Sequence, residues 1–177
     1  MKSKDWHGIM KIIEIKHLDV DGTVLWKQEH IHNIIHNEGE EYILRAAFTG
    51  GRVSSVIPDN YYVGLDNRSV VDVTDTMDDL VGEPATFGYE RQPIASSGDF
   101  VINFQDDHYI AQSPIIAFQA SGGTWGPVVN LFFTNLINNT GYLISTATFD
   151  SAFSVQSGQS VTLRVNMLLR DCINCPA

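Results

Sequence analysis

Cysteine is scarce in this 177-residue sequence, which contains only Cys172 and Cys175. Two cysteines in the last six residues cannot form a disulfide framework, so the fold must rest on the burial of apolar side chains. The pair forms a lone C-x-x-C, whereas a structural zinc site takes four ligands and a redox motif opens a helix within a βαβ unit. We interpret both as free thiols, with a contact between chains or a metal shared across an oligomer as the alternatives.

Positive charge is also in short supply. Lys and Arg number 11 against 21 Asp and Glu, which gives a net charge of −10 and a pI near 4.8. Such a surface repels phosphate backbones, and the lysines nearest the N-terminus, at positions 2, 4, 11 and 16, are too widely spread to form a basic patch. We therefore expect no nucleic-acid partner.

Long apolar runs are missing as well. No stretch approaches the roughly 20 residues that a membrane-spanning helix needs. Residues 1–10 lack the apolar core of a signal peptide. We therefore expect no membrane partner and assembly in a cytoplasm.

Catalytic signatures are missing too. The sequence has no G-x-S-x-G elbow, no P-loop and no G-x-G-x-x-G. Serines in predicted turns, such as Ser96, Ser97 and Ser157, have no persuasive histidine and acid partners. The expectation is a protein that is not an enzyme and uses no cofactor.

Alternating strands are what the sequence does contain. Residues 10–20 alternate, with Ile13 and Ile15 on one side, and a second alternating run begins at Val24. Between them lies Asp21-Gly22, a dipeptide suited to the positive φ angles of a tight turn. This pattern predicts an N-terminal β-hairpin. The alternative for Asp19-Val20-Asp21-Gly22, the start of a calcium loop, lacks a third ligand and a closing glutamate.

The period changes to that of a helix over residues 37–48. Asn37 can cap the helix, Glu40 stands where a capping box needs it, and Gly50-Gly51 can end it. The predicted apolar stripe consists of Ile43, Leu44, Ala47 and Phe48.

Short strands then follow one another. After a strand at 61–65 and a helical turn at 75–80 capped by Thr74, the predicted strands are 86–93, 100–104, 110–119, 128–136, 142–149 and 160–170. Such spacing is typical of a sandwich. We predict a mainly β fold, an antiparallel β-sandwich (jelly-roll- or Ig-like) with an N-terminal hairpin and one or two short helices. The predicted organisation is an N-terminal arm over 1–10, one domain over 11–171 and a tail over 172–177.

Three histidines form a candidate metal set. His30 and His32 point to the same side of a predicted strand, and His36 follows closely. The spacing is similar to the first motif of cupins, but the glutamate is displaced and the second motif is absent. Surface histidines, or histidines hydrogen-bonded beside the helix start, are the competing interpretation.

Other polar and aromatic groups have two interpretations each. The acidic run Asp72, Asp75, Asp78, Asp79 and Glu83 is either a solvated face or a cation site. Trp125, between Gly122-Gly123 and Gly126-Pro127, is either an exposed anchor for a partner or a side chain folded back over the end of the sandwich. Trp6 lies in an otherwise polar arm and could contact a neighbouring subunit.

Three segments form a pattern when they are taken together. One runs from Trp26 through Asn33-Ile34-Ile35-His36-Asn37-Glu38-Gly39 into the predicted helix and contains an "N-x-x-x-N-x-G" step. Another contains Tyr61-Tyr62-Val63-Gly64-Leu65-Asp66, Thr74-Asp75-Thr76, Gly82-Glu83 and Gly88-Tyr89-Glu90-Arg91. The third, Val155 to Leu163, has the form of a closing strand pair. Together these segments span most of residues 20–170 and resemble those of small tailed-bacteriophage virion proteins.

The resemblance implies a β-sandwich subunit of a virion, assembled in the host cytoplasm. Its partners would be the major capsid protein or other virion proteins, and it would form a homo-oligomer. The leading hypothesis is a capsid decoration, or cement, protein. The alternatives are a component of the tail, neck or a fibre, a cupin-like metal protein, and a carbohydrate-binding sandwich.

Overall fold

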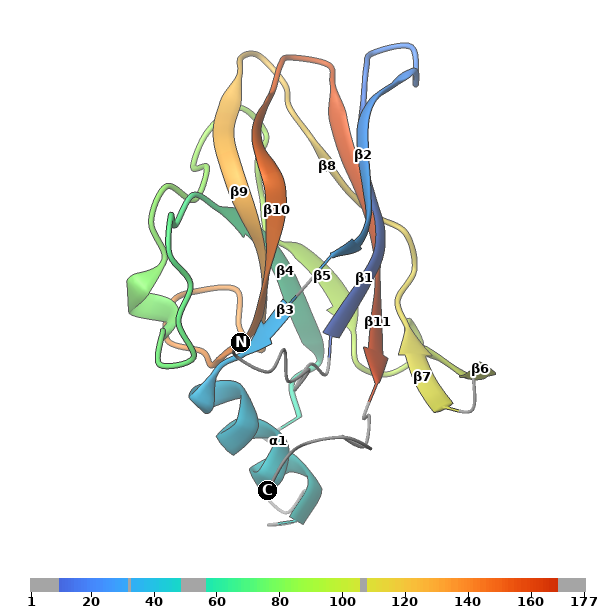
Figure 1. The fold of residues 1–177 in the computed structure, drawn as a ribbon, viewed down its shortest axis with the longest axis vertical. Coiled ribbons are helices and arrows are strands. Elements are labelled where there is room, and N and C mark those ends of the chain that lie inside the picture. The colour runs from blue at the N-terminus through green and yellow to red at the C-terminus, as the bar shows by residue number, and fades with distance from the viewer. Residues whose placement is uncertain (1–9, 32, 49–56, 106–107, 169–177) are drawn as a thin grey trace, which may run out of the picture.

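Two antiparallel sheets face each other in this protein (Figure 1). The computed structural model describes residues 10–31, 33–48, 57–105 and 108–168. The first sheet has the strand order β2 (Val24–Ile31), β1 (Met10–Leu18), β11 (Ser160–Leu168), β7 (His108–Gln112), β6 (Val101–Gln105), and β8 (Ile116–Gln119) also pairs with β11. The second has the order β3 (Asn33–Ile35), β10 (Leu143–Val155), β9 (Trp125–Thr134), β4 (Asn60–Asp66), β5 (Gln92–Ala95).

Within the described ranges, two helical elements accompany the sheets. Helix α1 (Asn37–Phe48) follows β3 and contacts β10, and a 3-10 turn, η1 (Met77–Asp79), lies in the connection between β4 and β5. The predicted mainly β sandwich with an N-terminal hairpin and one or two short helices is confirmed.

The N-terminal hairpin forms where Asp21-Gly22 predicted it. The Asp19 amide donates to the Thr23 carbonyl at 2.8 Å, and Gly22 adopts a φ of +86°, which glycine reaches without strain. A register shift between Ile12 and Glu14 changes the side to which the first residues of β1 point. Ile12 and Ile15 are therefore fully buried and Ile13 only partly, so the prediction that Ile13 and Ile15 share one side of the strand was wrong.

Helix α1 has the predicted bounds but contacts the sheet through a different face. Gly39 and Tyr42 are buried, whereas Leu44 and Phe48 of the predicted stripe are 58% and 81% exposed. A Cβ at Gly39 would overlap the Ile144 carbonyl, so this glycine lets the helix backbone lie directly on β10. The face of α1 that contacts the sheet is determined by the close approach of its backbone to that of β10. The positions of apolar residues in the sequence do not indicate this approach.

Some predicted boundaries were wrong for local reasons. The 3-10 turn is capped by Thr76 instead of Thr74, and the strand predicted at 86–93 is observed at Gln92–Ala95. The strand predicted at 110–119 is two strands, separated at Ser113. There the Ser113 hydroxyl accepts from the Val165 amide at 3.0 Å, which replaces a backbone partner in the ladder.

One main apolar core lies between the sheets. In β11, Val161, Leu163 and Val165 are buried and alternate with partly buried residues, but the alternation ends at Asn166, which is buried as well. Residues of both sheets and of α1 belong to the same cluster.

Candidate functional site

His36 is a buried, hydrogen-bonded histidine. Its side chain is fully buried at the start of α1, with Nδ1 2.9 Å from the Asp72 carbonyl and Nε2 2.8 Å from Thr146 Oγ1. A carbonyl can only accept, so Nδ1 carries the proton and Nε2 accepts from the Thr146 hydroxyl. Both ring nitrogens are thus engaged, and neither is free to bind a metal.

The neutral state of His36 fits its surroundings. Burial lowers the pKa of His36 from 6.5 to about 4; the hydrogen bond to Asp72 opposes this shift, and the nearby Arg68 cation adds to it. The choice between a metal ligand and a hydrogen-bonded histidine is therefore decided for this residue. The other two predicted ligands are His30 and His32. The side chain of His30 and the whole of His32 lie outside the part of the chain that the structure describes. Within the described ranges, no group of three His, Cys, Asp or Glu side chains could hold a metal ion.

Arg68 links this histidine to the loop that follows β4. Its Nε is 2.5 Å from Asp66, its Nη1 is 2.9 Å from Asp75, and its Nη2 donates to Thr146 Oγ1 at 2.9 Å. Arg68 is 4% exposed and Asp66 is fully buried. Burial raises the pKa of Asp66, and the Arg68 charge opposes that shift. The network fastens the loop to the second sheet.

The acidic run is mostly used within the fold. Asp75 pairs with Arg68, Asp79 accepts from the Thr76 amide at 2.8 Å, and Asp72 accepts from the Thr74 amide at 3.0 Å. Glu83 pairs with Arg91 at 2.6 Å. Asp72, Asp78 and Asp79 are exposed, as a solvated face predicts, whereas the partly buried Asp75 and Glu83 compensate buried arginines.

Trp125 is a core residue, so of its two interpretations the exposed anchor is wrong. Its side chain is 3% exposed, and its ring lies edge-on to Tyr89, with the ring centroids 5.6 Å apart. It is therefore not available to a partner. The other predicted contact residue, Trp6, lies outside the described residues, as do Cys172 and Cys175.

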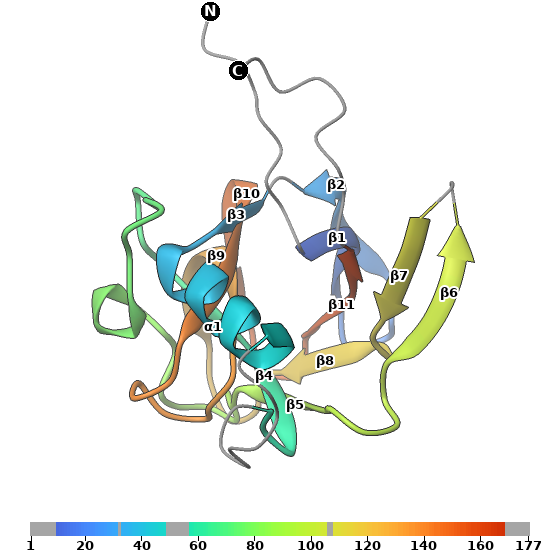
Figure 2. The same cartoon turned by 90° about the horizontal axis from the view of Figure 1, so that it is seen from below.

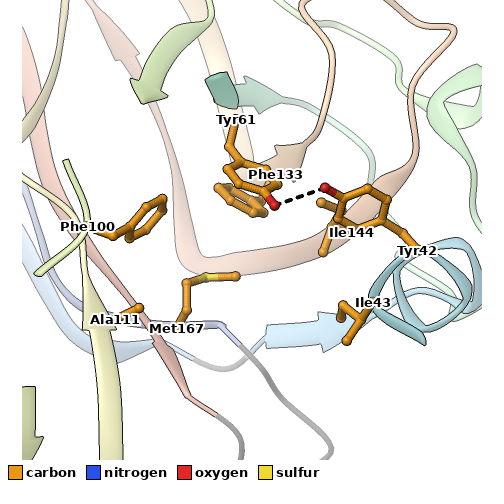
Figure 3. A pocket seen from close by; sticks show the side chains of 8 residues that line it. All are labelled: Tyr42, Ile43, Tyr61, Phe100, Ala111, Phe133, Ile144 and Met167. Carbon is orange, nitrogen blue, oxygen red and sulfur yellow. Dashed lines mark hydrogen bonds between the residues drawn. The ribbon is translucent and has the colours of Figure 1, made fainter. Parts of the chain in front are cut away.

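An apolar cleft opens between the sheets beside α1 (Figure 3). It offers about 250 Å³ of space. Its lining comes from α1, from β4, β9 and β10 of one sheet, from β7 and β11 of the other, and from the residue before β6. These residues are Tyr42, Ile43, Tyr61, Phe100, Ala111, Phe133, Ile144 and Met167.

Two phenols supply the polar atoms of the cleft's side chains. The hydroxyls of Tyr42 and Tyr61 lie 2.9 Å apart and satisfy each other (Figure 3). Burial raises the pKa of Tyr42 well above its usual range, so this phenol stays protonated. Among the described residues that line the cleft, none is a base that could activate a nucleophile, and the chemistry of this lining suits the binding of an apolar side chain.

The apolar surface continues beyond the cleft. Ala111 pairs with Ile102, and Tyr109 pairs with Phe104, so the side chains of these pairs share the face on which Ala111 lines the cleft. Ile102, Phe104 and Tyr109 are 65%, 63% and 71% exposed. We call these three residues the apolar row. Figure 1 shows β6 and β7 toward the end of the sandwich where α1 lies, and Figure 2 shows that they project from one side of it.

The sequence predicted the strand that contains Ile102 and Phe104, but it did not predict that their side chains are exposed. Phe100, Ile102 and Phe104 alternate as a half-buried strand would, and the same pattern usually indicates a core face. The one additional signal is that Val101, on the other side of the strand, is apolar too. Both sides of β6 are in fact exposed.

Comparisons with protein-family models, with curated proteins and with solved structures found no match to this chain.

Proposed function

We propose that this protein is a non-enzymatic structural subunit of a tailed-bacteriophage particle. In its most specific form, the proposal is a capsid decoration protein that binds the outside of the shell built by the major capsid protein. The observation that carries it is the apolar row beside the apolar cleft. A soluble chain with a net charge of −10 that exposes these large side chains together has a surface suited to another protein.

The residues of the phage-like segments support a structural role. Gly82-Glu83 and the Gly88-to-Arg91 stretch are separate in the sequence, yet Glu83 accepts from Arg91 Nε at 2.8 Å and from the Tyr89 hydroxyl at 3.0 Å. Arg91 also donates to the Ile137 carbonyl at 2.9 Å. The segments thus contribute contacts that hold loops, which is what a resemblance between structural proteins would consist of.

The hydrogen bonds of His36 weaken the cupin-like alternative. A metal site built from His30, His32 and His36 loses His36, whose two nitrogens already have partners. A component of the tail, neck or a fibre remains the alternative within the particle, because it would use the same kind of apolar contact surface.

A binding experiment with shells tests the proposal. Purified protein should co-sediment with shells of the phage that carries this sequence, and Tyr109→Glu should abolish that binding, because it places a charge in the apolar row. Val70→Glu is the matched control, since Val70 is 76% exposed and lies outside the row. Circular dichroism and thermal unfolding would show that both variants fold.

A second variant tests the predicted arm. Because β1 begins at Met10, deletion of residues 1–9 leaves the strand whole, and shell binding should weaken if the arm contacts a neighbour. Binding that survives Tyr109→Glu unchanged, or wild-type protein that does not bind shells, would contradict the proposal.

A further inference from the structure

Strand β1 begins and β11 stops at the end of the sandwich where α1 lies, which is also where the apolar cleft is found (Figure 1). Met10, the first residue of β1, pairs with Met167 of β11, and Met167 lines the cleft (Figure 3). Paired residues of an antiparallel ladder point to the same side of the sheet, so the fully buried Met10 side chain lies beside that of Met167. Residues 1–9 therefore join the described part of the chain next to the cleft.

The apolar lining of the cleft continues into an open side of α1. Ile43 lines the cleft, and Leu44 and Ala47, which belong to the same predicted stripe, are exposed. The sequence predicts that this stripe is covered, and the described residues leave Leu44 58% exposed. The cleft and this side of the helix thus form an apolar face that the described part of the chain leaves without a partner.

We infer that Trp6 of the same chain fills the cleft. In an extended continuation of β1, residues 8 and 6 alternate onto the side of Met10, because every second side chain of a strand lies on one face. The four residues from Met10 to Trp6 span at most about 14 Å, so the indole stays within reach of Met167. Gly8, the residue between them on this side, has no side chain that would compete for the space. The apolar row then remains as the open apolar surface of the molecule.

The size and the chemistry of the cleft favour a tryptophan. A volume of about 250 Å³ is small for a drug-sized ligand, whose sites start near about 300 Å³, and suits one large side chain. One hydroxyl of the Tyr42–Tyr61 pair donates to the other, which leaves lone pairs that can accept from the indole N–H. Leu169, which follows the described part of β11, is the competing occupant, but its smaller side chain would leave the cleft partly empty.

Charge and connectivity favour this chain's own segment. Residues 1–9 contain Lys2 and Lys4 against Asp5 alone, in a chain whose net charge is −10. Glu40 is exposed one turn before Ile43 and Leu44 on α1, and no described residue forms an ion pair with it. A weakly basic segment is therefore attracted to the acidic start of this helix. Because Trp6 is tethered a few residues from the cleft, its effective concentration there is far above that of another molecule.

Nuclear Overhauser contacts in the purified full chain test this inference. The experiment needs no shell, so its outcome is separate from that of the proposed function. With labelled methionine methyl groups, the Trp6 indole protons should contact the methyl group of Met167, and Trp6→Phe assigns the indole signals. Met77 is the internal control, because it packs in a separate cluster with Phe132 and Leu143 and should show no contact to Trp6.

Thermal unfolding tests the same contact by substitution. Trp6→Ala should lower the thermal midpoint by about 4 to 8 °C, because it removes a large aromatic side chain from the cleft. His7→Ala is the matched control, since residue 7 lies on the opposite side of an extended segment, and it should change the midpoint little. Free indole should raise the midpoint of Trp6→Ala but not that of the wild type, whose cleft is already filled.

Three results would overturn the inference. The first is a Trp6 indole without a contact to Met167. The second is a Trp6→Ala midpoint equal to that of His7→Ala, above all if Leu169→Ala lowers it instead. The third is a Trp6–Met167 contact that disappears on dilution, which would mean that the cleft holds the segment of a second copy.

Discussion

Acid should destabilise this protein through His36, and the effect can be worked out from the structure. The neutral ring donates to Asp72 and accepts from Thr146, whose hydroxyl oxygen also accepts from Arg68. Protonation of Nε2 would turn that acceptor into a donor facing a hydroxyl already committed to it, and would place a second cation near Arg68. The folded state therefore resists protonation.

The sign and size follow from the two pKa values of this histidine. The pKa is about 4 in the folded chain and near 6.5 in the unfolded chain, so the unfolded chain binds more protons between these values. The contribution of His36 to stability is therefore fully present above pH 6.5 and is lost as the pH falls toward 4. Between pH 7 and pH 4.5 the free energy of unfolding should decrease by about 2.5 kcal/mol because of this residue.

Urea unfolding at a series of pH values from 7 to 4.5 measures this. The matched variant is His36→Gln, whose side chain does not titrate, so the wild-type profile minus the variant profile isolates the histidine. The variant should be less stable at pH 7 and should show a flatter dependence on pH. Two parallel profiles would refute the reasoning, because they would mean that His36 is not held neutral in the folded state.

Two further substitutions probe how the loop and the helix are held. Arg68→Met should lower the free energy of unfolding, measured by chemical denaturation, by about 3 to 5 kcal/mol, because it leaves the buried Asp66 carboxylate without its counter-ion. The double variant Arg68→Met/Asp66→Asn should recover part of that loss. No recovery would argue against a coupled pair. Gly39→Ala should lower the free energy of unfolding by about 1 to 3 kcal/mol despite the better helix propensity of alanine, because its Cβ would overlap the Ile144 carbonyl. An unchanged thermal midpoint would show that the helix can move away from β10 without a loss of stability.

Much of the fold could be predicted because its signals are local. Asp21-Gly22 specifies a hairpin turn, and the change of period over residues 37–48 indicates a helix. Both depend on residues close in sequence, and both elements are observed.

What failed depends on contacts between distant residues. Leu44 and Phe48 belong to a reasonable apolar stripe, but the helix lies on β10 through Gly39, a contact that spans 105 residues between Gly39 and Ile144. Trp125 stands among glycines that suggest an exposed turn, and only the packing of Tyr89 against it shows that it is core.

The candidate site was harder to predict than the fold. The His36 network depends on Asp72 and Thr146, which local patterns do not connect to the histidine. The exposure of β6 is a property of its place at a sheet edge. Its sequence, Val-Ile-Asn-Phe-Gln, is equally suited to a buried strand.

Under the proposed virion role, the number of copies of this protein per purified phage particle is the most direct test. Quantitative mass spectrometry against the major capsid protein would measure it. A capsid decoration protein should be present in hundreds of copies, in a fixed ratio to the shell subunits. A few copies per particle would indicate a component of the neck, the tail or a fibre. Absence of the protein from purified particles would contradict any virion role.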